Sequence, residues 1–191
     1  MYEYISGRLS DITPATAVID CGGVGYLLEI TLNTYSAIQE KQEVRLWVHE
    51  IIREDAHLLY GFFTPQERKM FRLLIGINGV GAATARMMLS SLTVEELQSA
   101  IASQDVKMVQ RVKGVGAKTA QRIVLELQDQ AMPIDAIAGT ASTLPASRNK
   151  EEALSALVML GFPKANADKV LQPLDNSLPV EALIKEALKR L

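Results

Sequence analysis

The sequence predicts a multidomain α+β protein in which a strand-rich N-terminal part is followed only by helices. Three observations support this prediction. Hydrophobic and polar residues alternate within the first 63 residues, which is the period of a β-strand. A helical period replaces this alternation at Thr64, and one short glycine-containing phrase occurs twice in the helical part, 35 positions apart. A stretch with proline, glycine and serine at 131–148 then precedes a last helical segment.

Composition indicates a globular protein without a membrane or metal partner. The 191 residues are 48% hydrophobic, enough for one large domain or two to three small ones. No apolar run approaches the roughly 18 residues that span a bilayer, and the start at Met1 lacks a signal-peptide profile, so we expect a cytoplasmic location. Cys21 is the only cysteine, and with two histidines it forms no recognisable zinc spacing. We expect no cofactor and no metal.

Charge is distributed unevenly along the chain. The formal net charge is −2, but residues 1–63 hold four Lys/Arg against nine Asp/Glu, a net charge of −5. Residues 64–130 hold nine against six, a net charge of +3, and residues 131–191 hold seven of each. Because local potential attracts a ligand more than bulk charge does, we expect a negatively charged ligand at 64–130.

Residues 1–63 are expected to form about five short strands. Alternation is regular over 44–49 and over 28–32, so the latter strand is expected to include Leu32. The glycines of 22–25 predict a hairpin turn, and further strands are expected at 4–9 and 58–62. A closed barrel of this size is typical of the OB-fold, so an OB-like β-barrel is predicted.

Residues 64–130 are expected to be all helical. Thr64 and Glu67, and again Thr93 and Glu96, have the spacing of a capping box, in which each side chain caps the backbone of the other residue. Proline at position 65 suits the first turn of a helix. We therefore expect one helix from Thr64 to about 75, one from Thr93 to about 102, and one from the second repeat to about 130.

The repeated phrase has the arrangement of a helix-hairpin-helix, so the segment is predicted to be a tandem helix-hairpin-helix domain. In each copy a hydrophobic residue precedes a Gly-Val-Gly turn and the start of a helix; the turns are Gly79, Val80, Gly81 and Gly114, Val115, Gly116. We expect both glycines of a turn to permit positive φ, and the valine to point inward. Free amides at the following helix N-terminus attract phosphate, and phosphate contacts do not distinguish bases. Sequence-independent DNA binding is therefore predicted.

The two copies differ in charge. Lys113, Lys118 and Arg122 surround the second copy, with Thr119 at its helix start, and Lys118 and Arg122 share a helix face. The first copy has Ala83 in place of the lysine and offers mainly Arg86. We expect the second copy to bind phosphate more strongly.

Other interpretations of the glycine-rich turns fit less well. A dinucleotide-binding fingerprint would need a third glycine where Thr84 and Thr119 stand, and a strand instead of a helix before it. A Walker A loop needs a Gly-Lys pair, which Ala117 separates here. The plain alternative is that both copies are tight turns between helices, without a ligand.

Residues 131–191 are expected to be a flexible linker followed by a bundle of three short helices. The linker is predicted at 131–148 and the helices at 149–161, 163–171 and 179–191. A domain this small on a loose linker is better suited to docking a partner than to chemistry.

With these features in place, the chain resembles the RuvA family, the DNA-binding subunits of the bacterial Holliday junction branch migration complex. The resemblance rests on Gly22–Tyr26, Arg53–Ala56, Leu58–Phe62, both hairpins, the linker and the terminal helices. It implies an OB-like domain at 1–63, a DNA-binding domain at 64–130, and a C-terminal domain at 149–191 that binds the hexameric RuvB ATPase.

The resemblance further implies a homotetramer on four-way junction DNA, in some cases covered by a second tetramer to make an octamer. The RuvC resolvase is an implied partner, and the implied roles are DNA recombination, DNA repair and the SOS response to DNA damage. Lys118 matches a family phosphate-contacting position, whereas Ala83 stands where the family often has lysine. The first hairpin would then depend on its backbone amides.

Glu54 and Asp55 match the acidic pin of this family. By themselves, adjacent carboxylates are typical of a solvated loop, and a metal site would need a third ligand that the sequence does not indicate. In a four-fold assembly the acidic pairs would cluster where DNA strands cross and would repel phosphates, which keeps the junction open.

We expect a non-catalytic, structure-selective DNA scaffold, and two other functions are weighed against it. Helix-hairpin-helix pairs also occur in glycosylases and nucleases, but the sequence shows no catalytic constellation of His, Cys or carboxylates. A single-strand binder that uses the barrel is disfavoured by the charge of −5 and the few aromatic residues.

Overall fold

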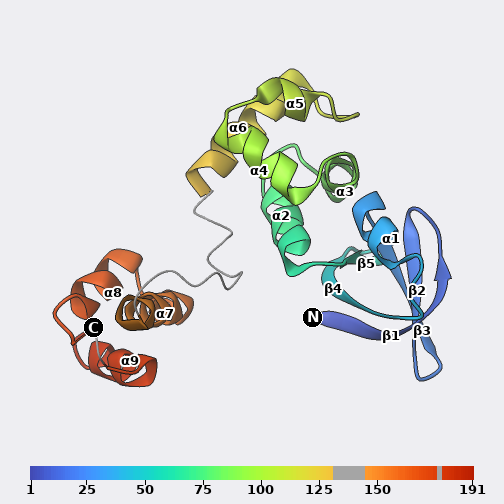
Figure 1. Ribbon diagram of the computed structural model, residues 1–191. Coiled ribbons are helices and arrows are strands. Elements are labelled where there is room, and N and C mark those ends of the chain that lie inside the picture. Colours follow the sequence, from blue (N-terminus) through green and yellow to red (C-terminus); the bar gives the residue numbers. More distant parts are fainter. Residues whose placement is uncertain (131–144, 176–177) are drawn as a thin grey trace. The chain divides into compact units, whose positions relative to one another are not determined.

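The computed structural model describes residues 1–130, 145–175 and 178–191 (Figure 1). The chain divides into two compact units, Met1–Ile134 and Asp135–Leu191. Most of the predicted linker, at 131–144, lies outside the described residues. Among the residues that are described, no helix combines the length and apolar character needed to cross a membrane.

The first unit begins with a closed β-barrel, as predicted. Its strands are β1 (Tyr4–Ile12), β2 (Thr16–Cys21), β3 (Val24–Ile30), β4 (Glu43–Ile52) and β5 (His57–Phe62). The strand order is β1-β2-β3-β5-β4; β3 pairs with β5 in parallel, and the other neighbours are antiparallel. The alternation seen in the sequence corresponds to the two faces of the sheet, because Val44, Leu46 and Val48 all point into the barrel core.

The helix α1 (Leu32–Ile38) corrects the prediction of a strand through Leu32. Thr31 keeps an extended backbone, and its side chain accepts a hydrogen bond from the Thr34 amide, so Thr31 is the N-cap of α1. The alternating pattern therefore continues up to the cap residue and ends at Leu32, the first residue of the helix.

The rest of the first unit is helical, as predicted. The helices are α2 (Pro65–Ile75), α3 (Ala82–Ser91), α4 (Val94–Ala102), α5 (Val106–Gln110) and α6 (Ala117–Gln130). The predicted ends of α2, α4 and α6 agree with the structure. Helix α5 was not predicted; it is short, and Asp105 caps it by accepting a hydrogen bond from the Met108 amide at 3.0 Å.

Only one of the two predicted capping boxes is complete. At α4, Thr93 and Glu96 cap each other's backbone amides. At α2, the Thr64 hydroxyl accepts from the Glu67 amide at 3.1 Å, but the Glu67 carboxylate turns to the barrel. There it accepts hydrogen bonds from the hydroxyls of Thr31 and Thr34. The prediction for Glu67 was wrong because a buried partner from another element replaced the local one.

The barrel interior and the helices have separate hydrophobic cores, and strand β5 contributes to that of the helices. Tyr60 and Phe62 of β5 belong to the core of the helical part, where their rings lie 5.0 and 4.9 Å from the ring of Phe71 in α2, measured between centroids. The change from strands to helices at 63/64 therefore lies inside one compact unit.

The second unit contains α7 (Pro145–Met159), α8 (Lys164–Leu171) and α9 (Val180–Leu188). Helix α7 begins at Pro145, so residues 145–148, predicted as linker, are helical; proline suits this first helical position. The core of the unit consists of small and aliphatic residues from all three helices, among them Leu157, Leu171 and Leu183.

Candidate nucleic-acid interface

The two Gly-Val-Gly turns have the same backbone geometry. Gly79 lies between α2 and α3 and Gly114 between α5 and α6, and each has φ of +90°. In each copy the valine amide donates to the carbonyl three residues before it, at 3.0 Å from Val80 to Ile77 and at 3.1 Å from Val115 to Val112. The repeat in the sequence is therefore a repeat of structure, and each copy forms a helix-hairpin-helix.

Only the first glycine of each turn has a positive φ, which corrects the prediction that both glycines use this freedom. Gly81 is the N-cap of α3 with φ of −84°, a conformation open to any residue, and Gly116 is likewise not among the positive-φ residues. A Cβ atom added at any of the four turn glycines would meet no other atom within 4 Å. The second glycine therefore leaves open space in front of the helix N-terminus, where a ligand can approach closely.

Val80 and Val115 anchor the turns from the inside, as predicted. Their side chains are only 5% and 6% exposed and pack in the hydrophobic core of the helical part. Helix α3 has no side-chain cap on its first amides, so these donors remain available for an anion. With about half a unit of positive charge at a helix N-terminus, phosphate is the ligand that this geometry suits.

Lys113 and Lys118 are the available cations of the second hairpin. Both are exposed, and within the described parts of the chain neither side chain makes a hydrogen bond or an ion pair. Thr119 is partly exposed at the start of α6. Phosphate binding by Lys113, Lys118 and Thr119 stays a prediction.

Arg122 connects the two hairpins. Its Nη1 donates to the Asn78 carbonyl of the first turn at 2.9 Å, and its Nε lies 3.8 Å from Glu126 Oε1 on the same helix. Arg122 belongs to the second copy but supports the turn of the first, directly before Gly79.

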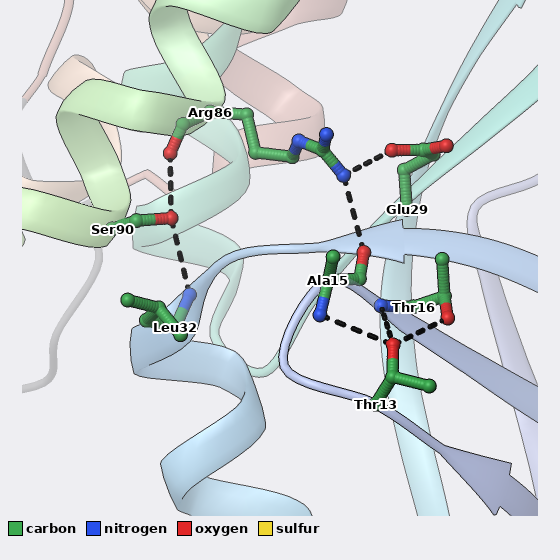
Figure 2. A network of polar contacts seen from close by, with 7 residues as sticks. All are labelled: Thr13, Ala15, Thr16, Glu29, Leu32, Arg86 and Ser90. Carbon is green, nitrogen blue, oxygen red and sulfur yellow. Dashed lines mark hydrogen bonds and ion pairs between the residues drawn. The ribbon is translucent and has the colours of Figure 1, made fainter. Parts of the chain in front are cut away.

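Arg86 is already engaged inside the first unit. Its guanidinium forms an ion pair with Glu29 of β3, and its Nη1 donates to the Ala15 carbonyl at 3.1 Å (Figure 2). The fold therefore pairs Arg86, which was predicted to bind phosphate, with residues of the barrel. Nothing local in the sequence indicates the pairing, because 57 positions separate the two residues.

Sequence reasoning missed two further cations of the second hairpin. Lys107 lies on α5 and Arg111 follows its last residue, directly before the turn, and both are exposed. Their spacing of four residues would have indicated a common face if α5 had been predicted.

The acidic pair lies at the tip of the hairpin between β4 and β5. Glu54 and Asp55 are both exposed, and the Arg53 amide closes their loop by donating to the Ala56 carbonyl at 2.8 Å. Just beside this tip, the hydrogen bond from His57 holds the pKa of Glu50 below its ordinary value. Among the described residues, no group of three His, Cys, Asp or Glu side chains is placed to hold a metal ion.

Family models and curated proteins match the whole organisation of the chain. The model of the RuvA N terminal domain matches residues 1–61, that of the SAM-like helix-hairpin-helix tandem matches 71–129, and that of the RuvA C-terminal domain matches 148–191. Similar proteins named Holliday junction branch migration complex subunit RuvA are 48% identical in Bacteroides fragilis, 45% in Christiangramia forsetii and 39% in Azobacteroides pseudotrichonymphae. Each alignment covers 100% of both chains.

Proposed function

The chain belongs to the RuvA family, and on that premise we propose that it is the subunit of a branch migration complex that binds four-way junction DNA. It binds the DNA by the phosphate backbone, independently of base sequence, and it performs no chemistry itself. It acts as a homotetramer that holds the junction open, while its C-terminal unit recruits the RuvB ATPase.

The duplicated turn is the observation that supports this proposal most. Both copies combine a buried valine, a positive-φ glycine and open space in front of a helix N-terminus. Tight turns alone would not need the second glycine, since Gly81 has a backbone conformation available to any residue. Close approach of a phosphate explains why a side chain is absent there.

The two hairpins contribute unequally to binding. The second hairpin has the exposed cations Lys113 and Lys118, with Lys107 and Arg111 beside them. The first hairpin has Ala83 and the internally paired Arg86, so it binds through its amides, with Arg122 holding its turn. The second hairpin supplies most of the salt-dependent affinity, because only neutralising cations release counterions from DNA.

The acidic pair gives the assembly its preference for junctions. In a tetramer, Glu54 and Asp55 of each subunit would meet where the four DNA arms cross. Their negative charge repels phosphates that approach the centre, so an uninterrupted duplex is disfavoured and the open junction is accepted. A second tetramer on the other face would make an octamer.

The second unit is the proposed docking site for the motor. Val158, Met159 and Leu160 at the end of α7 are exposed, and apolar side chains in a group suit a protein partner. Hydrolysis of ATP then occurs in RuvB, and the RuvC resolvase acts on the same junction.

Neutralising the acidic pair tests this function. We expect that a Glu54→Gln, Asp55→Asn variant will bind plain duplex more tightly than the wild type and will lose part of its preference for junctions. The matched control is Glu40→Gln, Glu43→Gln, which removes the same charge from exposed positions of the barrel segment. Fluorescence anisotropy with labelled junction and duplex measures both affinities.

Unchanged selectivity in the Glu54, Asp55 variant, or an equal change in the control, would remove the acidic pair from this role. Incubating wild-type protein with labelled junction and Mg²⁺ tests the enzyme alternative, since cleavage without RuvB would favour a nuclease. Tighter binding to single strands than to junctions would favour a single-strand binder.

A further inference from the structure

Helix α3, which begins at the first Gly-Val-Gly turn, is attached to the barrel through Arg86. The guanidinium forms an ion pair with Glu29 and donates to the Ala15 carbonyl at 3.1 Å (Figure 2). The side chains of Arg86 and Glu29 are 27% and 33% exposed, so the pair is partly shielded from solvent.

The barrel side of this contact is held firmly by its own hydrogen bonds. The Thr13 hydroxyl accepts from the amides of Ala15 and Thr16 at 3.3 and 3.0 Å, which forms a tight turn between β1 and β2 (Figure 2). The Ala15 carbonyl also accepts from the Ile30 amide at 2.9 Å. Arg86 therefore binds a carbonyl whose position is already fixed.

A second group of contacts holds α3 one turn further on. The Ser90 hydroxyl donates to the Arg86 carbonyl at 2.8 Å and accepts from the Leu32 amide of α1 at 3.1 Å. Asn33 of α1 donates to the carbonyls of Leu89 and Leu92 at 2.7 and 3.2 Å. Because α3 is held at two places along its length, its direction relative to the barrel is fixed, and so is the direction of its N-terminal amides.

The strand that Arg86 contacts, β3, is next to β5, the strand that follows the acidic pair. Glu29 of β3 lies opposite Tyr60 of β5 in the parallel ladder, and β5 starts at His57, just after Glu54 and Asp55. The contact thus connects the phosphate-facing end of the first hairpin with the hairpin that presents the acidic pair.

We propose that Arg86 is a positioning residue that determines junction selectivity, and that it does not bind phosphate. By holding α3 on Glu29 and Ala15, Arg86 sets where the amides of the first hairpin lie relative to Glu54 and Asp55. A four-way junction fits only one such spacing, whereas a duplex can bind a single hairpin surface. This inference rests on the proposed function, since it concerns selectivity for junctions.

Arg86→Ala, Glu29→Gln and the double variant distinguish positioning from phosphate contact. We expect each single variant to lower the ratio of junction to duplex affinity by about three- to tenfold, with duplex affinity and its salt dependence nearly unchanged. The double variant should be no worse than Arg86→Ala alone, because Arg86→Ala already removes both the ion pair with Glu29 and the hydrogen bond to Ala15. Glu43→Gln is the matched control for the lost charge, and Asn33→Ala, which releases the other end of α3, should lower the ratio too.

Glu29→Gln removes the ion pair but leaves the charge of Arg86 and its hydrogen bond to the Ala15 carbonyl in place. Phosphate binding by Arg86 would give a different result. Glu29→Gln would keep the wild-type ratio of junction to duplex affinity, whereas Arg86→Ala would weaken binding to both and lower the salt slope by about one. That outcome would show that the inference is wrong. Unchanged binding in both variants also overturns it. Failure of the wild type to prefer junctions would instead contradict the proposed function, so the two failures are distinguishable.

Discussion

At the scale of single residues, the cations of the two hairpins have separate uses. Arg86 and Arg122 donate to carbonyls elsewhere in the first unit, whereas Lys113 and Lys118 are exposed and make no hydrogen bond or ion pair within the described residues. An arginine with several donors can hold two groups at once, but a lysine on a flexible stem acts as a point charge. We therefore propose that these two arginines position the hairpins and that the lysines attract the DNA.

Replacing Lys118 by alanine should weaken junction and duplex binding together. We expect the slope of log affinity against log salt to fall by about one, the value for one lost phosphate contact. Titrations at several salt concentrations measure this slope, and Lys164→Ala on α8 of the second unit is the control. A slope equal to that of the wild type would show that Lys118 lies outside the interface.

At the scale of elements, the two glycines of the first hairpin turn are needed for different reasons, one for its backbone conformation and the other for the space that it leaves. Gly79 has φ of +90°, which strains a residue with a Cβ atom, whereas Gly81 has φ of −84°, which does not. Neither position has an atom within 4 Å of an added Cβ, so crowding inside the protein does not distinguish them.

Gly79→Ala and Gly81→Ala form a matched pair of variants that tests this separation. Gly79→Ala should destabilise the first unit by about 1 kcal/mol or more, because alanine must adopt a positive φ. Gly81→Ala should cost less stability but weaken DNA binding, since its methyl group occupies the space in front of the α3 amides. Denaturant unfolding followed by Trp47, the only tryptophan of the chain, reports on the first unit. Equal losses of stability in Gly79→Ala and Gly81→Ala would contradict the assignment of the conformational need to Gly79.

At the scale of the whole molecule, both apolar and polar contacts hold the barrel and the hairpins together as one unit. Phe71 packs on aromatic rings of the barrel, while the Glu67 carboxylate accepts from Thr31 and Thr34 of the barrel side. Burial raises the pKa of Glu67 above its ordinary value, and the two threonine hydroxyls offset part of this effect.

The stability of the first unit should therefore depend on pH through Glu67. A raised folded-state pKa means that the folded form binds the proton more tightly, so its stabilising contribution is complete below the ordinary glutamate pKa of about 4.3. This contribution is lost as pH rises through the raised value. The free energy of unfolding of the wild type minus that of Glu67→Gln should thus decrease from pH 4 upward.

The opposite dependence is expected for Glu3, whose pKa is lowered by its hydrogen bond from Arg68. Comparing wild type and Glu67→Gln at each pH cancels that contribution, because Glu3 is present in both. A difference that does not vary with pH would contradict the role given to Glu67. Trp47 fluorescence again restricts the measurement to the first unit.

Much of the architecture and of the candidate site follows from the sequence because it depends on local interactions. A strand alternates with period two, a capping threonine acts within three residues, and a Gly-Val-Gly turn is complete within one short phrase. The barrel, the start of α2, the capping box of α4 and both hairpins were predictable for this reason. The short helices α1 and α5 were not, because 7 and 5 residues are too few to show a helical period.

The tertiary structure alone decided which charged and polar groups meet across the fold. Glu67 meets Thr31 across 36 positions, Arg122 meets Asn78 across 44, and Arg86 meets Glu29 across 57. Each of these side chains could also have had a local or a solvent-exposed partner, and only the packing of the helices on one another and on the barrel selects among these. The sequence by itself thus determined the two Gly-Val-Gly turns, whereas the folded unit determined how those turns are held relative to the acidic pair.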